Sequence, residues 1–256
     1  MRAVGVHPDV VVVTSRIWQT NATALRSGGE VLLIDSPYFP DELELLPALL
    51  RQAGFEPNAL FATHADYDHV LGKLAFPDLA LGVGDPTMER IRTSPGEVQR
   101  ELRDEDARNY VVRETPLSLG SVQSLPVPGY VELGEIELEL HVADGHTPDG
   151  TAVFARPYGV LVVGDYLSDV EIPWISPGGS LDDYRATLAR LAPLVEAAET
   201  IVPGHGLPHG RDTALRLLDE DLDYLDALAE GAQRLPKARD TARQREIHAE
   251  NLARLS

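Results

Sequence analysis

The order of strand-like and helix-like segments predicts an α/β protein with one domain. Short runs of apolar residues alternate with longer segments whose apolar residues recur at helical spacing. The 256 residues contain no repeat, low-complexity tract or linker that would divide them. A chain of this length buries enough surface to fold without a disulfide or a structural metal ion. We therefore expect a single domain over residues 1–256, with the C-terminal helices of residues 212–255 packed on it.

The predicted strands are short apolar runs that end at turn residues. Glu30–Ile34 reads E-V-L-L-I and is followed by Asp35-Ser36-Pro37, which is typical of a buried strand. Gly134–Ala143 alternates apolar and polar residues and predicts a half-buried antiparallel strand. The other predicted strands are Val10–Ser15, Ala22–Leu25, Ala59–Thr63, Leu79–Val83, Ala152–Ala155, Gly159–Val163 and Thr200–Val202.

The predicted helices carry an apolar stripe on one face. Asp41–Ala53 has leucines at helical spacing and ends before Gly54. Leu181–Leu191 and Thr213–Leu228 are further predicted amphipathic helices, and Gln244–Leu255 is predicted as a C-terminal helix. Pro86–Arg108 is polar, rich in Glu and Arg, and compatible with a helix. We expect this last segment to be an excursion at the surface.

The composition excludes several classes of function. The chain has no cysteine, so disulfides, thiolate nucleophiles and cysteine metal ligands are excluded. Its 41 acidic and 22 basic residues give a formal net charge of −19, which repels a nucleic-acid backbone. No apolar segment approaches the ~20 residues of a membrane span, and Val10–Val13 is too short for a signal-peptide core. We expect a cytoplasmic protein with a small-molecule substrate and neither nucleic acid nor membrane as a partner; its oligomeric state stays open.

Histidine and aspartate residues follow several of the predicted strands. Four motifs occur in order along the chain, and each follows a strand: T-H-A-D-Y-D-H at 63–69, G-H-T-P around His146, G-D at Asp165, and P-G-H-G around His205. Residues two apart in an extended loop point the same way, so His64 and Asp66 can bind one ion. Glycines beside the later residues allow a close approach of the backbone. The joint pattern predicts a metal centre.

This series of motifs resembles that of the metallo-β-lactamase superfamily, whose pattern is H-x-H-x-D-H followed by His, Asp and His. The resemblance covers roughly residues 10–210. It implies a four-layered αβ/βα sandwich with the site at one edge of two facing sheets. It also implies two divalent metal ions, with Zn²⁺ expected first and Fe or Mn as alternatives. The implied ligands are His64, Asp66 and His146 for the first metal, Asp68, His69 and His205 for the second, and Asp165 bridging both.

Two positions depart from the family pattern. Asp35 stands in the family's D-x-G turn, which here reads Asp-Ser-Pro, and by resemblance it orients the ligands. Asp66 stands where most members have histidine. Together with Asp68, Asp165 and a hydroxide, it would balance the charge of two divalent cations completely, which tilts the selection from Zn²⁺ towards Fe or Mn. The alternative is that Asp66 turns away and only one metal is bound.

The resemblance implies hydrolysis by a metal-bound hydroxide. Asp165 would bridge the metals, and Asp68 would accept a proton as the intermediate collapses. We expect a small ester, thioester or lactone as the substrate. One alternative is a mononuclear iron enzyme like the family's persulfide dioxygenases, with His64, His146 and Asp165 as its ligands. Another is a metal-binding protein without catalysis.

The subclass is not identified by the motifs. True β-lactamases carry Cys or Ser where this chain has Asp165, and lactonases carry tyrosine where it has Ser168. The extra segments of RNA-processing members and the C-terminal region of glyoxalase-II-like thioesterases are not recognisable. The candidates for contact with the substrate are Tyr67, Tyr166, Trp174, His209 and His248. Packing is the alternative role for both tyrosines.

Overall fold

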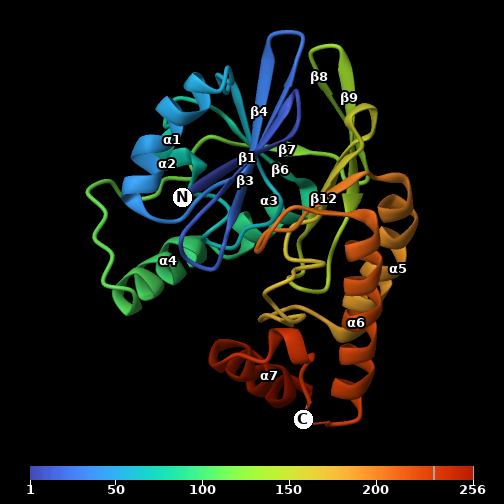
Figure 1. Cartoon of the computed structure of the whole chain (residues 1–256). Helices are drawn as coiled ribbons and strands as arrows, with labels where there is room; N and C mark the ends of the chain where they lie inside the picture. Colours follow the sequence, from blue (N-terminus) through green and yellow to red (C-terminus); the bar gives the residue numbers. More distant parts are fainter. Residues whose placement is uncertain (233, 256) are drawn as a thin grey trace.

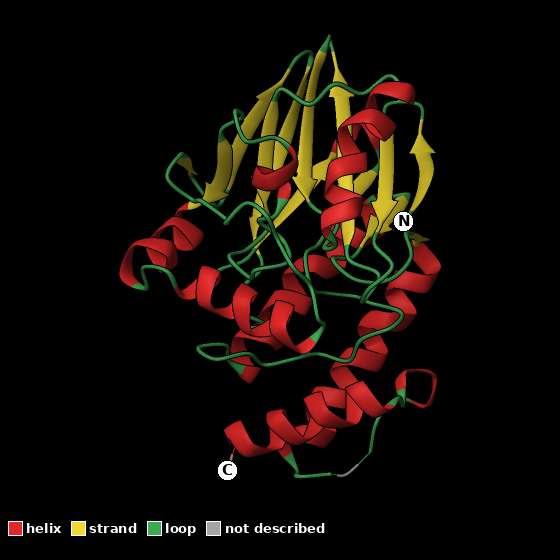
Figure 2. Ribbon diagram, turned by 90° about the vertical axis from the view of Figure 1, so that its left-hand side faces the viewer, coloured by secondary structure: helices red, strands yellow, loops and turns green. Residues whose placement is uncertain are grey.

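The computed structural model describes residues 1–232 and 234–255. Within these residues two β-sheets lie face to face, and helices cover the outer face of each sheet (Figures 1 and 2). This arrangement is the four-layered α/β sandwich that the sequence predicts. The N-terminal half of the chain forms one sheet with its helices, and the C-terminal half forms the other (Figure 1).

The first sheet has seven strands whose spatial order is their order in the chain. They are β1 (Arg2–His7), β2 (Val10–Thr14), β3 (Asn21–Ser27), β4 (Glu30–Asp35), β5 (Ala59–Ala62), β6 (Leu81–Gly84) and β7 (Val122–Leu125). The pairings β1-β2, β2-β3 and β3-β4 are antiparallel, whereas the pairings β4-β5, β5-β6 and β6-β7 are parallel. The parallel strands end at one edge of the sheet, and the loop after β5 begins there.

The second sheet has six strands in the order β13-β12-β11-β10-β9-β8. They are β8 (Gly129–Leu133), β9 (Ile136–Val142), β10 (Thr151–Ala155), β11 (Val160–Val162), β12 (Thr200–Val202) and β13 (His209–Gly210). The 3₁₀ turn η1 (Arg156–Tyr158) connects β10 to β11, which pair antiparallel as a hairpin. Strands β11 and β12 are parallel, so the loops after both leave the same edge of the sheet.

The helices divide between the two halves of the molecule (Figure 1). The first half contains α1 (Pro40–Gln52), α2 (Gly72–Ala75), α3 (Asp85–Thr93) and α4 (Glu97–Arg108). The second half contains α5 (Leu181–Ala197), α6 (Arg211–Ala229), the 3₁₀ turn η2 (Lys237–Arg239) and α7 (Ala242–Leu255). Helices α5 and α6 pack against each other, and α6 also contacts α7.

Apolar side chains fill the space between the layers. Ile34 and Leu138 are fully buried between the two sheets. Leu46 is on the buried face of α1, and Leu188 is on the buried face of α5. Burying one such side chain stabilises the fold by about 1.5–3 kcal/mol. These three buried clusters explain why the chain needs no disulfide, in agreement with its lack of cysteine.

The structure confirms every predicted strand and helix to within a few residues at most ends. It adds strands that the sequence analysis missed, among them β1, whose first four residues are exposed, and β7, whose middle residues are exposed. Such edge strands lack a buried face and therefore show weak alternation. The expectation for Pro86–Arg108 was wrong in part, because α3 and α4 direct several of its side chains into the interior.

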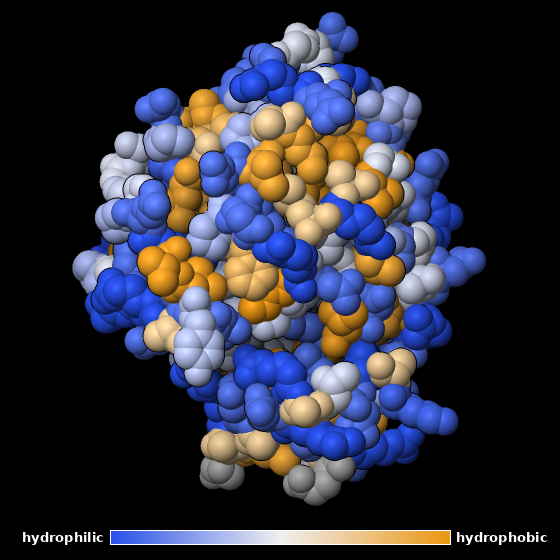
Figure 3. Space-filling model, turned by 60° about the vertical axis from the view of Figure 1, so that its left-hand side comes forward, coloured by the Kyte–Doolittle hydropathy of each residue, from blue (hydrophilic) through white to orange (hydrophobic). Residues whose placement is uncertain are grey.

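The surface shown in Figure 3 is mainly hydrophilic, and its hydrophobic residues form separate patches between hydrophilic ones. Among the described residues, no helix combines the length and the apolarity that crossing a bilayer requires.

Candidate metal centre

The loops that follow four strands meet at one edge of the two sheets. The loop 63–69 follows β5, His146 lies between β9 and β10, Asp165 follows β11, and His205 follows β12. In Figure 2 the strands end above a belt of loops, and α7 lies below that belt. Gly204 permits the close approach, since a Cβ there would lie 2.1 Å from Oδ1 of Asp165. The four motifs of the sequence are therefore brought together in space.

A first group of ligand atoms consists of His64, Asp66 and His146, whose nitrogen and oxygen atoms lie within 4.8 Å of one another. Oδ2 of Asp66 is 3.7 Å from Nε2 of His64 and 3.5 Å from Nε2 of His146. Oδ2 of Asp165 lies 3.7 Å from His64 and 3.3 Å from His146. Asp66 thus faces this group and does not turn away.

A second group consists of Asp68, His69 and His205, again with ligand atoms within 4.8 Å. Nε2 of His69 is 3.8 Å from Oδ1 of Asp68, and Nε2 of His205 is 3.4 Å from its Oδ2. Asp165 also approaches this group. Its Oδ1 lies 3.2 Å from Nε2 of His69, and its Oδ2 lies 3.4 Å from Nε2 of His205. Asp165 therefore lies between the two groups, where the resemblance places a bridging ligand.

The four histidines of the site all direct Nε2 towards its centre. Each Nδ1 atom contacts an oxygen atom outside the two groups. Nδ1 of His64 lies 3.0 Å from Oγ1 of Thr63, and Nδ1 of His69 lies 3.1 Å from Oδ2 of Asp35. Nδ1 of His146 lies 2.7 Å from the carbonyl oxygen of Trp174, and Nδ1 of His205 lies 3.2 Å from that of Trp18. The buried Nε2 atoms of His64, His69 and His146 have no hydrogen-bond partner among the described residues. Buried polar atoms without a partner are costly, and a divalent cation accepting these lone pairs removes that cost. The donor set fits one metal ion in each group.

Asp35 connects the first sheet to the ligands. It lies at the end of β4 with a φ of 58°, a conformation that Asp tolerates better than most residues. Its Oδ1 accepts a hydrogen bond of 2.8 Å from the backbone N–H of Thr63, and its Oδ2 faces His69. The Thr63 hydroxyl donates to Asp35 and accepts from His64. Asp35 therefore orients two of the histidines, one directly and one through Thr63.

The carboxylates of the site draw protons onto the imidazoles. Burial opposes the charging of His146, but the negative charges of Asp165 and Asp66, whose Oδ2 atoms lie 3.3 and 3.5 Å from its Nε2, raise its pKa to about 10. Burial likewise opposes the charging of His205, and the charges of Glu171 and Asp165 raise its pKa to about 10. A metal ion therefore has to displace protons from both rings.

Arg90 is a site residue that the sequence analysis missed. From α3 its Nη1 donates to Oδ1 of Asp66 at 2.8 Å and to Oδ1 of Asp149 at 2.9 Å. Oδ2 of Asp149 accepts a hydrogen bond from the N–H of Ala65, which lies between His64 and Asp66. Arg90 looks in the sequence like any arginine of a polar helix, so no local pattern could have identified it.

A cleft opens onto the metal centre with a volume of about 40 Å³. Besides ligands, its walls contain Trp18, Tyr67, Glu171, Trp174, Arg243 and Ile247. Tyr67 and Trp174 were candidates from the sequence, whereas Trp18, Glu171 and the two residues of α7 were not. Burial, opposed by His205, raises the pKa of the Glu171 carboxyl. The cleft thus combines aromatic and aliphatic walls with one cationic side chain.

Three further candidates do not line this cleft, although the hydroxyl of Tyr166 accepts a hydrogen bond of 3.0 Å from the backbone N–H of His146. The hydroxyl of Tyr166 donates to the carbonyl of Asp144 at 2.5 Å, so its one proton is engaged. Nε2 of His209 bonds the carbonyl of Leu167 at 2.9 Å. Nδ1 of His248 bonds the hydroxyl of Tyr224 at 3.0 Å, and none of the three candidates lines the cleft. For each of these three residues, contact with the substrate stays a prediction that no interaction in the structure supports.

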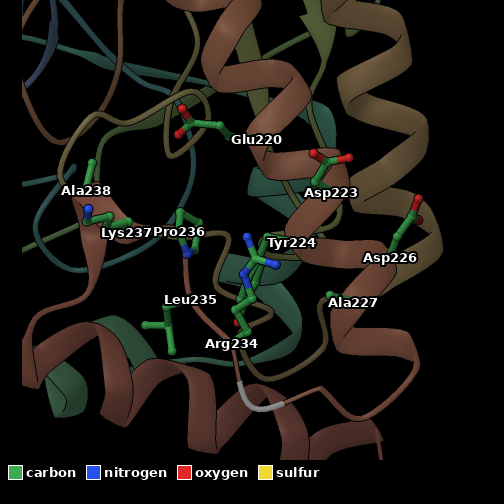
Figure 4. A pocket seen from close by; sticks show the side chains of 10 residues that line it. All are labelled: Glu220, Asp223, Tyr224, Asp226, Ala227, Arg234, Leu235, Pro236, Lys237 and Ala238. Atoms are coloured by element: carbon green, nitrogen blue, oxygen red, sulfur yellow. The ribbon is translucent and has the colours of Figure 1, made fainter.

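A larger cavity, of about 810 Å³, lies between α6 and residues 234–238 (Figure 4). Its walls are Glu220, Asp223, Tyr224, Asp226, Ala227, Arg234, Leu235, Pro236, Lys237 and Ala238. None of the residues predicted as metal ligands lines it. Its size alone therefore does not make it the reaction site.

Comparisons with known proteins agree with this geometry. The curated protein "Acyl-coenzyme A thioesterase MBLAC2" from Gallus gallus is 27% identical over 220 residues, which are 78% of this chain and 76% of that protein. The metallo-beta-lactamase family protein TTHA1429 from Thermus thermophilus superposes with a TM-score of 0.71 at 19% identity, covering 97% of this chain and 92% of that chain. The structure of TTHA1623 in a di-iron-bound form gives a TM-score of 0.60 at 25% identity, covering 80% of this chain and 97% of that chain. The sequence profile described as "Metallo-beta-lactamase superfamily" matches residues 16–205, more than half of the chain. The chain therefore belongs to the metallo-beta-lactamase superfamily.

Proposed function

We propose that this protein is a metal-dependent hydrolase of a small ester, thioester or lactone. The observation that carries the proposal is the pair of ligand groups joined by Asp165 at the base of a cleft. Two divalent cations held there supply Lewis acidity and lower the pKa of a water molecule towards neutrality. Both the family and the thioesterase relative support a hydrolase.

The chain's own residues would orient and relay protons. Asp68 lines the cleft and is held between His69 and His205. Its carboxylate is placed to accept a proton and to pass it to a departing group. Asp165 would keep the two ligand groups at a fixed separation.

We favour a thioester among the three substrate types. The relative that is named as an acyl-coenzyme A thioesterase covers 78% of this chain. Trp18, Trp174 and Ile247 offer apolar walls for an acyl group, and Arg243 offers a cation for an anionic leaving part. Because the cleft is small, about 40 Å³, we propose a short acyl group.

We propose Zn²⁺ as the resident metal and iron as the alternative. Imidazole and carboxylate ligands suit both metals. The di-iron-bound structure of TTHA1623 supports iron, at 25% identity. The guanidinium of Arg90, which also pairs with Asp149 and Glu97, offsets part of the charge of Asp66, which weakens the reason for preferring Fe or Mn that the sequence alone suggested.

A mononuclear iron dioxygenase would use His64, His146 and Asp165 and would leave the second group without a role. The compact grouping of Asp68, His69 and His205 therefore favours the hydrolase. The net charge of −19 supports a small-molecule substrate over nucleic acid. A cytoplasmic location and the absence of a membrane partner stay predictions from the sequence.

The experiment combines metal analysis with a substrate panel. We expect two metal ions per chain, cleavage of short acyl thioesters without O₂ uptake, and loss of activity with a chelator. Asp68→Asn should lower turnover by about 10²-fold or more, whereas Asp182→Asn at an exposed position of α5 should not. Metal saturation at one ion per chain, or O₂ consumption with glutathione persulfide and no hydrolysis, would refute the proposal.

A further inference from the structure

The two carboxylate oxygens of Asp66 face different partners. Oδ2 points into the site, 3.7 Å from Nε2 of His64 and 3.5 Å from Nε2 of His146. Oδ1 accepts a hydrogen bond of 2.8 Å from Nη1 of Arg90. A metal ion in the first group can therefore bind Asp66 through Oδ2 while Oδ1 stays with the guanidinium.

Arg90 is itself held firmly in place. The same Nη1 donates to Asp149 at 2.9 Å, and Nη2 contacts Oε1 of Glu97 from α4 at 3.1 Å. The Arg90 side chain is only 12% exposed. Asp149 accepts the N–H of Ala65, so the acidic partner of Arg90 also holds the loop between the two ligands. Helix α3 is thereby tied to the ligand loop through charged groups.

The ion pair changes the charge that a metal ion meets. A charge-assisted hydrogen bond in a partly buried site keeps both groups ionised. The electrostatic potentials of two opposite charges this close largely cancel at distances greater than their separation. Asp66 and Arg90 as a pair carry no net charge, as a neutral histidine ligand carries none, and Asp149 and Glu97 are the further carboxylates on the same guanidinium. The carboxylate then contributes a lone pair without adding net negative charge to the centre.

We propose that Asp66 and Arg90 act as one neutral ligand unit at the first metal position, with Arg90 as its positioning residue. Histidine at position 66 therefore fits only when the charge of Arg90 is removed as well. In Asp66→His alone, the guanidinium loses one of its three carboxylate partners, keeps Asp149 and Glu97, and faces a cation bound by three imidazoles. The inference rests on the metal-binding part of the proposed function and is independent of the substrate.

The test is a double-mutant comparison of metal affinity in protein stripped of metal. Wild type, Asp66→His, Arg90→Gln and Asp66→His/Arg90→Gln are titrated with Zn²⁺ against a chromophoric chelator. Gln removes the charge and retains an amide N–H donor on a shorter side chain. The first position is identified as the one that Asp66→Ala loses. Arg92→Met, an exposed residue of the same helix, is the matched control.

We expect Asp66→His to weaken the first position at least tenfold and the double variant to regain at least tenfold over Asp66→His. Circular dichroism and thermal unfolding separate these effects from a loss of fold. The inference fails if Asp66→His binds the first metal as tightly as wild type, if the double variant binds no more tightly than Asp66→His, or if wild type has no first-position metal. A chain that binds two metals with this pattern but cleaves no ester, thioester or lactone would overturn the proposed function and leave this inference standing.

Discussion

Oδ2 of Asp35 lies 3.1 Å from Nδ1 of His69, in the buried turn where β4 ends. The opposite ring nitrogen, Nε2, is 3.2 Å from Oδ1 of Asp165. A carboxylate behind a histidine fixes its tautomer and raises its basicity as a metal ligand. The loop around Asp35 therefore acts on the second ligand group without entering it.

Asp35→Ala should lower the affinity of the second metal position by about 10- to 100-fold, because His69 loses its orienting partner and Thr63 loses an acceptor. Asp35→Asn should lower it less, since an amide oxygen can still accept. Competition titrations with a chelator measure both. Asp78→Ala, an exposed aspartate in the loop before β6, is the control and should leave the affinity unchanged. Unchanged affinity in Asp35→Ala would contradict the role given to Asp35.

Asp66→Ala should remove the metal of the first group while Asp68, His69 and His205 still hold the second. Turnover should fall with the metal count. The fold should persist, because the buried apolar clusters do not depend on Asp66 and Arg90 keeps Asp149 and Glu97 as partners. Metal analysis and turnover of the purified variant test this. Two metals and full activity in Asp66→Ala would show that Asp66 is not a ligand.

Metal binding should release protons near neutral pH. Since the pKa values of His146 and His205 are raised to about 10 in the metal-free site, both rings are protonated there below that pH. Coordination through Nε2 removes those protons, so metal affinity should rise as the pH increases towards about 10 and weaken as it falls. Titration calorimetry at pH near 7.5 in buffers of different ionisation enthalpy counts the protons.

We expect release of at least one proton per metal ion. His141→Gln is the control, because His141 pairs with Glu139 in β9 and should not change the count. Affinity that is independent of pH between 7 and 9 would contradict the assignment of protons to these two rings.

Arg243→Gln should weaken the binding of anionic thioesters selectively. The side chain lines the cleft and is 49% exposed, so its contribution is that of a surface charge, about 0.3–1 kcal/mol, or roughly a two- to fivefold higher KM. The KM of a short neutral thioester and kcat for both substrates should stay unchanged. Arg245→Gln, on the same helix and paired with Asp240, is the control. An equal rise of both KM values would mean that Arg243 acts on the fold of α7 and not on charge.

Segments whose own residues carry a clear pattern could be predicted from the sequence. Glu30–Ile34 predicted β4 because a buried strand is apolar throughout, and Asp41–Ala53 predicted α1 because its leucines follow helical spacing. The edge strands β1 and β7 escaped because their exposed side chains leave little periodicity. The single-domain organisation stays a prediction.

The fold class and the ligand-bearing motifs, from T-H-A-D-Y-D-H at 63–69 to P-G-H-G around His205, could be predicted from the amino-acid sequence. Local chemistry sufficed there, because strand ends and the spacing of ligands are properties of neighbouring residues. The pairing of Arg90 of α3 with Asp66, and the contribution of Arg243 and Ile247 of α7 to the cleft, became visible in the folded chain. Arg90 and Asp66 are 24 residues apart in the chain. The α7 residues are much farther in sequence from the ligand loop that they face across the cleft. Their contacts depend on how α3 and α7 pack on the rest of the molecule, and no local periodicity encodes that packing.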